Sequence, residues 1–316
     1  MIGESREAMP DDPEISVVVP VRNEEDNVQE LARQLQDALP VSHEMIFVDD
    51  GSTDGTWARL AEIHDSGRVR LVRFAAGCGK SAALMAGFAR CRAPVIFTLD
   101  GDLQDDPAEI PRFLTKLAEG HGLVSGWKKV RHDPLHKVAA SRVFNFVMRK
   151  ASGLDLHDMN CGFKCYRAEV AKRLQIHGDQ HRFIPVFAAD WGYTVAEVEV
   201  AHRPRVHGRS KYGLSRLAKG FLDLGTVLLR TRYKDRPAHA FGVMAAIGAS
   251  KGLALLLVAA TGWLPRPAEW AVIALGAALL VSAPALLAAG WVSEYLLHLD
   301  ARSGRLHRPA IKDARD

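Results

Sequence analysis

The sequence lacks a long apolar run before Ile15, so we expect no signal peptide. Cysteine is scarce, because the 316 residues hold only four, and we interpret these as reduced thiols of an intracellular protein. Cys161 and Cys165 have no second ligand pair nearby, so a zinc site is not expected. The formal net charge of +4 is too small to indicate nucleic acid as a partner.

Short apolar runs alternate with amphipathic stretches over the first two thirds of the chain. This alternation predicts an α/β fold with a doubly wound, mostly parallel sheet. The expected strands are residues 15–20, 44–48, 69–74, the run from Val95 that leads into Asp100, 123–126 and 195–200. Asn23 and Asp54 are expected to cap the helices after the first two strands, and Asp106 precedes a proline that opens another helix.

Two carboxylates and an amide follow the fourth apolar run, at Asp100, Asp102 and Gln104. Side chains two apart in an extended segment point the same way, and the carboxyl ends of strands in open α/β sheets bind ligands. Oxygen ligands so placed suit Mg²⁺ or Mn²⁺. A solvated acidic turn is the alternative, and this pattern alone does not exclude it.

The pattern changes near Leu214. Apolar residues at helical spacing over 214–228 predict either a core-packing helix or a helix that lies on a membrane surface. Residues 240–264 and 270–297 are each long enough to cross a bilayer, which needs about 20 residues. Basic residues flank both runs, so we expect a multi-pass protein of the cell (inner) membrane with a cytoplasmic catalytic domain.

The first apolar run contains one charge, Lys251, which costs roughly 2.5–3.5 kcal/mol in a bilayer centre and is expected to face another helix or a lipid headgroup. Gly248 and Gly252 have the spacing that lets helices pack closely, which indicates a homo-oligomer. The expected organisation is a flexible tail over 1–13, an α/β catalytic region over 14–212, a juxtamembrane amphipathic region over 213–237, two transmembrane helices over 238–298 and a basic cytoplasmic tail over 299–316.

A nucleotide-hydrolysing protein is one alternative. The stretch from Gly77 to Ser81 ends like a P-loop between a strand and a helix. A P-loop, however, needs a glycine five residues before Gly79, where this chain has Phe74. A membrane-associated NTPase therefore stays a minor alternative, and a non-catalytic lipid-binding scaffold is the rival from another class.

Seven short motifs occur in one order along the chain, at residues 19–24, 48–54, 79–83, 100–104, 141–145, 158–163 and 205–212. Together they resemble the GT-A inverting glycosyltransferases of family 2 that charge polyprenyl phosphate with a sugar. Dolichyl-phosphate mannosyltransferases and bacterial undecaprenyl-phosphate glucosyltransferases belong to this group. The resemblance covers roughly residues 14–300.

The resemblance implies a donor site and a metal site. The nucleotide sugar, UDP-sugar first and GDP-sugar second, would contact Pro20, Arg22, Glu24, Asp50, Lys80 and Asp100. Mg²⁺ or Mn²⁺ would bind Asp100, Asp102 and Gln104. The reaction implied is transfer of a hexose-type sugar to polyprenyl (undecaprenyl or dolichyl) phosphate at the membrane.

The resemblance also implies an acceptor site. Arg182, Arg205 and Lys211 would bind the acceptor phosphate, and the catalytic group would consist of Asp102, Asp158, Arg205 and Lys211. Asp158 is either a base or a structural carboxylate that caps the following turn, and the sequence favours neither.

Two departures from the family pattern concern nucleotide and sugar preference rather than reaction type. Ala75–Cys78 replaces a common asparagine before the Gly-Lys loop, and Trp127–Lys129 stands where an arginine is common. The chain has no Gln-x-x-Arg-Trp, so a processive polysaccharide synthase is not expected.

Overall fold

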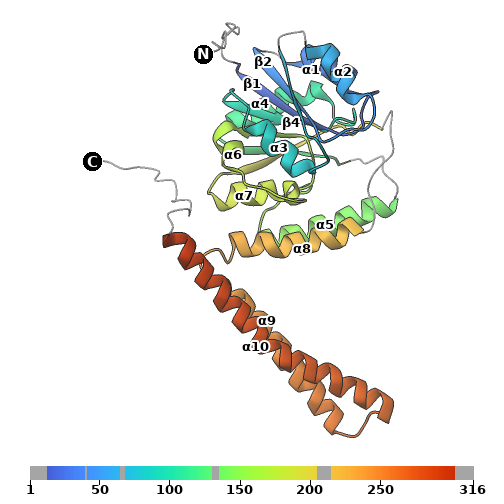
Figure 1. Cartoon of the computed structure of the whole chain (residues 1–316), viewed down its shortest axis with the longest axis vertical. Coiled ribbons are helices and arrows are strands. Elements are labelled where there is room, and N and C mark those ends of the chain that lie inside the picture. The colour runs from blue at the N-terminus through green and yellow to red at the C-terminus, as the bar shows by residue number, and fades with distance from the viewer. Residues whose placement is uncertain (1–12, 40, 65–67, 130–134, 205–214, 303–316) are drawn as a thin grey trace, which may run out of the picture. The chain divides into compact units, whose positions relative to one another are not determined.

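One mixed sheet organises the first part of the protein. The computed structural model describes residues 13–39, 41–64, 68–129, 135–204 and 215–302 (Figure 1). Within these residues, seven strands lie in the order β3-β2-β1-β4-β6-β5-β7. The strands are β1 (Ile15–Val21), β2 (His43–Asp49), β3 (Val69–Arg73), β4 (Val95–Thr98), β5 (Leu123–Trp127), β6 (Lys164–Arg167) and β7 (Val195–Glu199). The predicted α/β fold with a mostly parallel sheet is confirmed.

Strand β6 is the strand that sequence analysis missed. It runs antiparallel to both β4 and β5, and Cys165 at its centre faces Phe97 on one side and Val124 on the other. The strand has only four residues and both ends are charged, so the local pattern is not that of a buried strand. Position in the sheet, rather than local sequence, makes these residues a strand.

Helices cover both faces of the sheet. Val17 and Phe97 belong to a core cluster with Leu35 of α1 (Val28–Ala38) and Phe113 of α4 (Ile110–Ala118). Val18, next in β1, points the other way, against α3 (Lys80–Phe88). The remaining helices of this part are α2 (Thr56–His64), η1 (Pro107–Glu109), α5 (Leu135–Ser152), α6 (Ala168–Arg173), η2 (Gln180–Phe183) and α7 (Ile184–Asp190).

Two of the three helix starts were predicted correctly. Asp54 accepts a hydrogen bond from the backbone of Thr56, and Asp106 accepts one from Ala108. The expectation for Asn23 is wrong, because α1 begins after Asn27. Asn23 instead adopts a left-handed conformation, with φ of 53°. Its side chain accepts a hydrogen bond from the backbone of Thr53.

The chain divides into two compact units, with the boundary between Val227 and Leu228 inside α8 (Ser215–Thr231). Leu224 and Val227 are buried within the protein. For the part of α8 whose side chains are described, the apolar stripe therefore has a core-packing role. A membrane-surface role of this helix stays a prediction.

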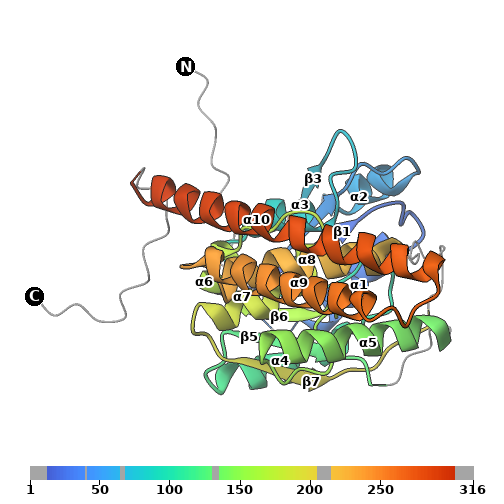
Figure 2. The ribbon, with the colours of Figure 1, turned by 90° about the horizontal axis from the view of Figure 1, so that it is seen from below.

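The second unit contains the two long apolar helices predicted from the sequence, α9 (Pro237–Ala260) and α10 (Arg266–Arg302), which pack side by side (Figures 1 and 2). A Cβ added at Gly252 would lie 2.7 Å from the carbonyl oxygen of Gly276. The close approach that these glycines allow is therefore used inside the hairpin, so Gly252 no longer indicates an oligomer. Lys251 is exposed on α9.

Candidate active site

A tight turn carries the predicted metal-binding residues. Strand β4 ends at Thr98, so Asp100 and Asp102 follow its carboxyl end as predicted, but the expectation of an extended segment through them is wrong. Oδ1 of Asp102 accepts a hydrogen bond from the backbone N–H of Gln104 at 3.3 Å. Between them Leu103 adopts a left-handed conformation, with φ of 59°, and its side chain is buried. A non-glycine residue in this conformation costs on the order of 1–3 kcal/mol, which the surrounding core must offset.

Asp100 is held from two sides at this turn. Its Oδ1 accepts a hydrogen bond from the ammonium of Lys80, the first residue of α3. On the other side, a Cβ added at Gly162 would lie only 2.5 Å from Oδ2 of Asp100. Burial opposes ionisation of Asp100, but the charges of Lys80 and Lys128 outweigh it and lower the pKa to about 2. Asp100 is therefore an anion at neutral pH and can bind a cation.

The loop that leads into α3 is organised by Asp50, at the end of β2. Oδ1 of Asp50 accepts from the backbone N–H of Cys78 at 2.6 Å, and both carboxylate oxygens lie 3.0 Å from that of Gly79. The guanidinium of Arg22 lies beside Gly77, with Nη1 3.9 Å from Asp50. In a P-loop, amides of this kind cradle phosphates. Here a carboxylate of the protein occupies them, which argues against the NTPase alternative.

The other predicted donor-site residues lie near this loop in the fold. Pro20 is next to the end of β1, beside Val48 of β2. The backbone N–H of Glu24 donates to Oγ1 of Thr56, and its carboxylate accepts from the side chain of Asn27. The predicted donor residues all lie at or after the carboxyl ends of β1, β2, β3 and β4.

Asp158 lies in a turn that precedes β6. It is almost fully buried, and its Oδ1 accepts a hydrogen bond from the backbone of Asn160 at 3.3 Å. The backbone N–H of Asp158 donates to Oε1 of Glu197 in β7 at 2.8 Å. The turn-capping alternative for Asp158 is therefore present in the structure.

Lys164 stabilises the same turn through its side chain. Its buried ammonium donates to the carbonyl oxygens of Met159, at 3.3 Å, and Cys161. Burial lowers its pKa from the ordinary value, against the attraction of nearby acidic groups. Thr98 donates to the carbonyl of Gly162 at 2.8 Å. Thr98 of β4 and Lys164 of β6 therefore both hold the turn whose glycine lies against Asp100.

Asp105 and Lys128 form a buried ion pair that the sequence did not reveal. Nζ of Lys128 lies 2.6 Å from Oδ1 of Asp105, and the two side chains are 12% and 1% exposed. Burial alone would lower the pKa of Lys128, but Asp105 and Asp100 raise it above its ordinary value. The signal in the sequence for an unusual role of Lys128 was the departure from the family pattern at Trp127–Lys129.

The predicted acceptor residues are only partly described. Arg182 lies in η2, is 7% exposed, and donates through Nη2 to Asp179 at 3.2 Å. Arg205 and Lys211 lie outside the described residues. Just before them, Arg203 is joined to the metal-site turn, because its backbone N–H donates to the carbonyl of Gln104 at 3.0 Å and its own carbonyl accepts from the Gln104 side chain.

Comparison with known proteins gives a consistent result. The sequence model of Glycosyl transferase family 2 matches residues 16–175. A dodecaprenyl-phosphate galacturonate synthase of Rhizobium johnstonii is 38% identical, over 78% of this chain and 74% of the relative. An undecaprenyl-phosphate 4-deoxy-4-formamido-L-arabinose transferase of Edwardsiella ictaluri is 32% identical, over 81% of this chain and 79% of the relative.

Among solved structures, the fold is similar to glucosyl-3-phosphoglycerate synthase of Mycobacterium tuberculosis, with a TM-score of 0.53 and 22% identity over 69% of this chain and 80% of that one. This likeness shows the GT-A fold. The family match and the two relatives show, in addition, which family the chain belongs to. The chain is a glycosyltransferase that belongs to family 2, among relatives named for sugar transfer to polyprenyl phosphate.

Proposed function

We propose that this protein transfers a hexose-type sugar, with inversion, from a nucleotide diphosphate sugar to polyprenyl phosphate. UDP-sugar is the expected donor and GDP-sugar the second choice. The observation that carries the proposal is the anionic Asp100, held between Lys80 and Gly162 at the carboxyl edge of a family 2 sheet. The relatives named for galacturonate and formamido-arabinose on polyprenyl phosphate support the acceptor class.

Asp100, Asp102 and Gln104 are the residues that we expect to hold Mg²⁺ or Mn²⁺. Among the described residues, no group of three or more His, Cys, Asp and Glu side chains could hold a metal ion by itself. Two carboxylates fit Mg²⁺, which usually binds one or two carboxylates together with substrate phosphates. The ammonium of Lys80 on Asp100 supports a cation site at this carboxylate. A bound divalent ion would neutralise charge on the departing nucleoside diphosphate.

The donor nucleotide would lie over the carboxyl ends of β1 and β2. Pro20, Arg22 and Glu24 border this region, and Asp50 shapes it by holding the amides of the Gly-Lys loop. Lys80, which pairs with Asp100, would be available to bind a donor phosphate if Asp100 held a metal ion. In either case a cation would balance the charge of Asp100.

The acceptor phosphate is the expected nucleophile. A phosphomonoester has a second pKa of about 6, so it is largely deprotonated at neutral pH. It needs orientation in line with the anomeric carbon more than it needs a base. Arg182, Arg205 and Lys211 are the cations that we expect to orient it, and the burial of Arg182 beside η2 supports a fixed position for this side chain.

We further propose that α9 and α10 cross the cell (inner) membrane and leave the catalytic unit in the cytoplasm. Only 17% of the most apolar part of α9 and 11% of that of α10 is buried inside the protein, whereas a core helix would be mostly buried. In sealed inside-out vesicles, added protease should reach the basic tail over residues 302–316. Cleavage only from the opposite face would reverse this topology.

The decisive experiment supplies purified full-length protein, in detergent, with undecaprenyl phosphate and a panel of nucleotide sugars plus Mg²⁺ or Mn²⁺. We expect one donor to give a polyprenyl-phosphate sugar, with loss of the product in excess chelator and in Asp102→Asn. Asp37→Asn, at an exposed ion pair on α1, is the matched control and should keep full activity. Activity of Asp102→Asn equal to that of the wild type would contradict the metal assignment.

The same assay separates the alternatives. A scaffold protein would give no product with any donor in the panel. An NTPase would release phosphate from ATP alone, at an enzymatic rate that Lys80→Ala abolishes. Self-association stays a prediction, which cross-linking in native membranes can test independently of activity.

A further inference from the structure

Ser81 and His181, a hundred residues apart, form a paired contact beside the candidate active site. The backbone N–H of His181 donates to Oγ of Ser81 at 3.1 Å. The same Oγ lies 3.2 Å from Nδ1 of the His181 ring. Ser81 is buried at the second position of α3, and His181 belongs to η2. One hydroxyl thus joins two elements through two hydrogen bonds.

The directions of these bonds follow from the chemistry of the hydroxyl. Because Oγ of Ser81 already accepts from the backbone of His181, its hydrogen is available to donate to Nδ1. We assign the tautomer in which the ring accepts at Nδ1 and carries its proton on Nε2. Burial and the charges of Lys80 and Arg182 lower the pKa of His181 well below its ordinary value, which agrees with a neutral ring in this position.

The contact connects the two halves of the candidate site. Lys80, immediately before Ser81, pairs with Asp100 on the donor side. Arg182, immediately after His181, is a candidate for the acceptor phosphate on the other side. Since each partner is adjacent in sequence to a cation of the site, a shift at this contact would move both cations.

We propose that Ser81 and His181 are positioning residues, whose contact sets the start of α3 so that Lys80 reaches Asp100 and the donor diphosphate, and holds Arg182 in register with it. The role of Lys80 toward a diphosphate rests on the proposed function. The contact itself touches no reacting atom, so its effect passes through the placement of Lys80 and Arg182.

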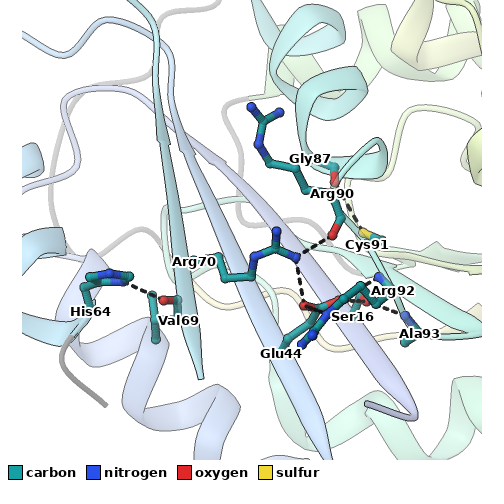
Figure 3. A network of polar contacts seen from close by, with 10 residues as sticks. All are labelled: Ser16, Glu44, His64, Val69, Arg70, Gly87, Arg90, Cys91, Arg92 and Ala93. Carbon is teal, nitrogen blue, oxygen red and sulfur yellow. Dashed lines mark hydrogen bonds and ion pairs between the residues drawn. The ribbon is translucent and has the colours of Figure 1, made fainter. Parts of the chain in front are cut away.

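The test compares three variants of the full-length protein with the wild type. Ser81→Ala removes both hydrogen bonds, and His181→Leu removes the ring acceptor but keeps the backbone bond. His181→Asn puts an amide oxygen close to the position of Nδ1 and should restore the acceptor. Matched controls are Ser16→Ala and His64→Leu, which remove a buried hydroxyl and a hydrogen-bonded ring at the opposite, amino-terminal edge of the sheet (Figure 3).

The measurement is the dissociation constant of UDP, and of GDP as second probe, by titration calorimetry with Mg²⁺ present. We expect weakening by about tenfold in His181→Leu, as for loss of one buried hydrogen bond, and by about tenfold or more in Ser81→Ala, which loses two. His181→Asn and both controls should bind within about twofold of the wild type. A general loss of stability would instead weaken binding in the controls as well. The double variant Ser81→Ala/His181→Leu should be no weaker than Ser81→Ala alone.

Wild-type affinity in Ser81→Ala and His181→Leu, failure of His181→Asn to rescue, or additive losses in the double variant would each overturn the inference. If His181→Leu does not fold, Ser81→Ala with its Ser16→Ala control still decides the outcome. No binding of either nucleotide to the wild-type protein would instead overturn the proposed function together with this inference, so the two failures are distinguishable.

Discussion

Gly162 lies against the carboxylate of Asp100 so closely that a methyl group on Gly162 would stand 2.5 Å from Oδ2. The turn before β6 therefore forms one wall of the candidate metal site. Thr98 and Lys164 fix this wall through the carbonyl oxygens of Gly162 and Cys161, respectively. The carboxylate can keep this position only while residue 162 has no side chain.

We predict that Gly162→Ala lowers transferase activity by about 100-fold or more, because a 1 Å misplacement of a positioned group can cost this much. The methyl group would displace the carboxylate of Asp100 from its position, so the Mg²⁺ concentration for half-maximal activity should rise too. Steady-state kinetics over a Mg²⁺ titration measures both effects. Gly225→Ala, at a helical glycine where the added Cβ meets nothing within 4 Å, is the control. Unchanged kinetics in Gly162→Ala would contradict this role of the glycine.

The contact between Gly162 and Asp100 is also an example of what the sequence could not predict. The strands before Asp50 and Asp100 were predictable, because β-branched runs between helices specify a parallel sheet. Strand β6 was not, because it becomes a strand only between β4 and β5. Consequently the approach of Gly162 to Asp100 could not be foreseen, although both residues belong to predicted motifs.

The hydrogen-bond and ion-pair partners within the site also could not be predicted from the sequence. Asp50 fits a nucleotide contact by its motif, yet its carboxylate accepts from the loop amides of Cys78 and Gly79. Asp105 and Lys128 are 23 positions apart, and no local pattern announces a buried ion pair between them. Hydrogen-bond and ion-pair partners depend on tertiary distances, which periodicity and motif order do not encode.

We predict that Asp50→Ala raises KM for the donor by about tenfold and lowers the free energy of unfolding by about 1–3 kcal/mol, since the loop amides of Cys78 and Gly79 lose a charged hydrogen-bond acceptor. The KM for polyprenyl phosphate should change much less, because the loop lies on the donor side. Donor and acceptor titrations together with thermal unfolding test this. Asp37→Ala, on the exposed face of α1, should leave both KM values unchanged. A larger effect on the acceptor than on the donor would contradict the assignment.

Glu44 gives a prediction about pH and stability at the opposite edge of the sheet (Figure 3). Its buried carboxylate accepts hydrogen bonds from Ser16 at 2.7 Å, the backbone of Arg92 at 2.7 Å and Nη1 of Arg70 at 3.2 Å. Burial would raise its pKa, but these bonds outweigh burial and lower the pKa below its ordinary value. The stabilisation is therefore fully present above the unfolded pKa of about 4.3 and is lost as the pH falls through the lower folded value.

We accordingly predict that Glu44→Gln unfolds with a free energy lower by about 1–3 kcal/mol at pH 7, and that the difference from the wild type narrows below about pH 4. Thermal unfolding in detergent over this pH range measures the difference. Glu62→Gln, at an exposed pair with Arg59, should stay within about 0.5 kcal/mol of the wild type at every pH. A difference that is constant with pH would show that Glu44 stabilises by packing alone.

The α9–α10 hairpin supplies a prediction about the membrane unit. Gly252→Val should separate the two helices, because even its Cβ would meet the carbonyl oxygen of Gly276 at 2.7 Å. Cross-linking between cysteines introduced at Gly248 and Leu279 should fall in this variant, since a Cβ at Gly248 lies 3.8 Å from the carbonyl of Leu279. Gly242→Val, where the added Cβ has no neighbour within 4 Å, is the control. Cross-linking that is unchanged in Gly252→Val would contradict the packing role.

The last prediction concerns whether the reaction uses a base. Asp158 is buried, its Oδ1 caps the turn at Asn160, and its backbone is held by Glu197. A phosphate acceptor with a second pKa of about 6 needs no base at neutral pH. We therefore predict that Asp158→Asn, which keeps an oxygen for the cap, retains at least tenfold more activity than Asp102→Asn.

The pH profile distinguishes a base from a turn cap. If Asp158 only caps the turn, kcat/KM of Asp158→Asn should still rise with pH through about 6, as the acceptor phosphate ionises. If Asp158 is the base, its replacement should abolish activity while both substrates still bind. A variant as inactive as Asp102→Asn, with unchanged donor and acceptor affinity, would therefore refute the base-free mechanism.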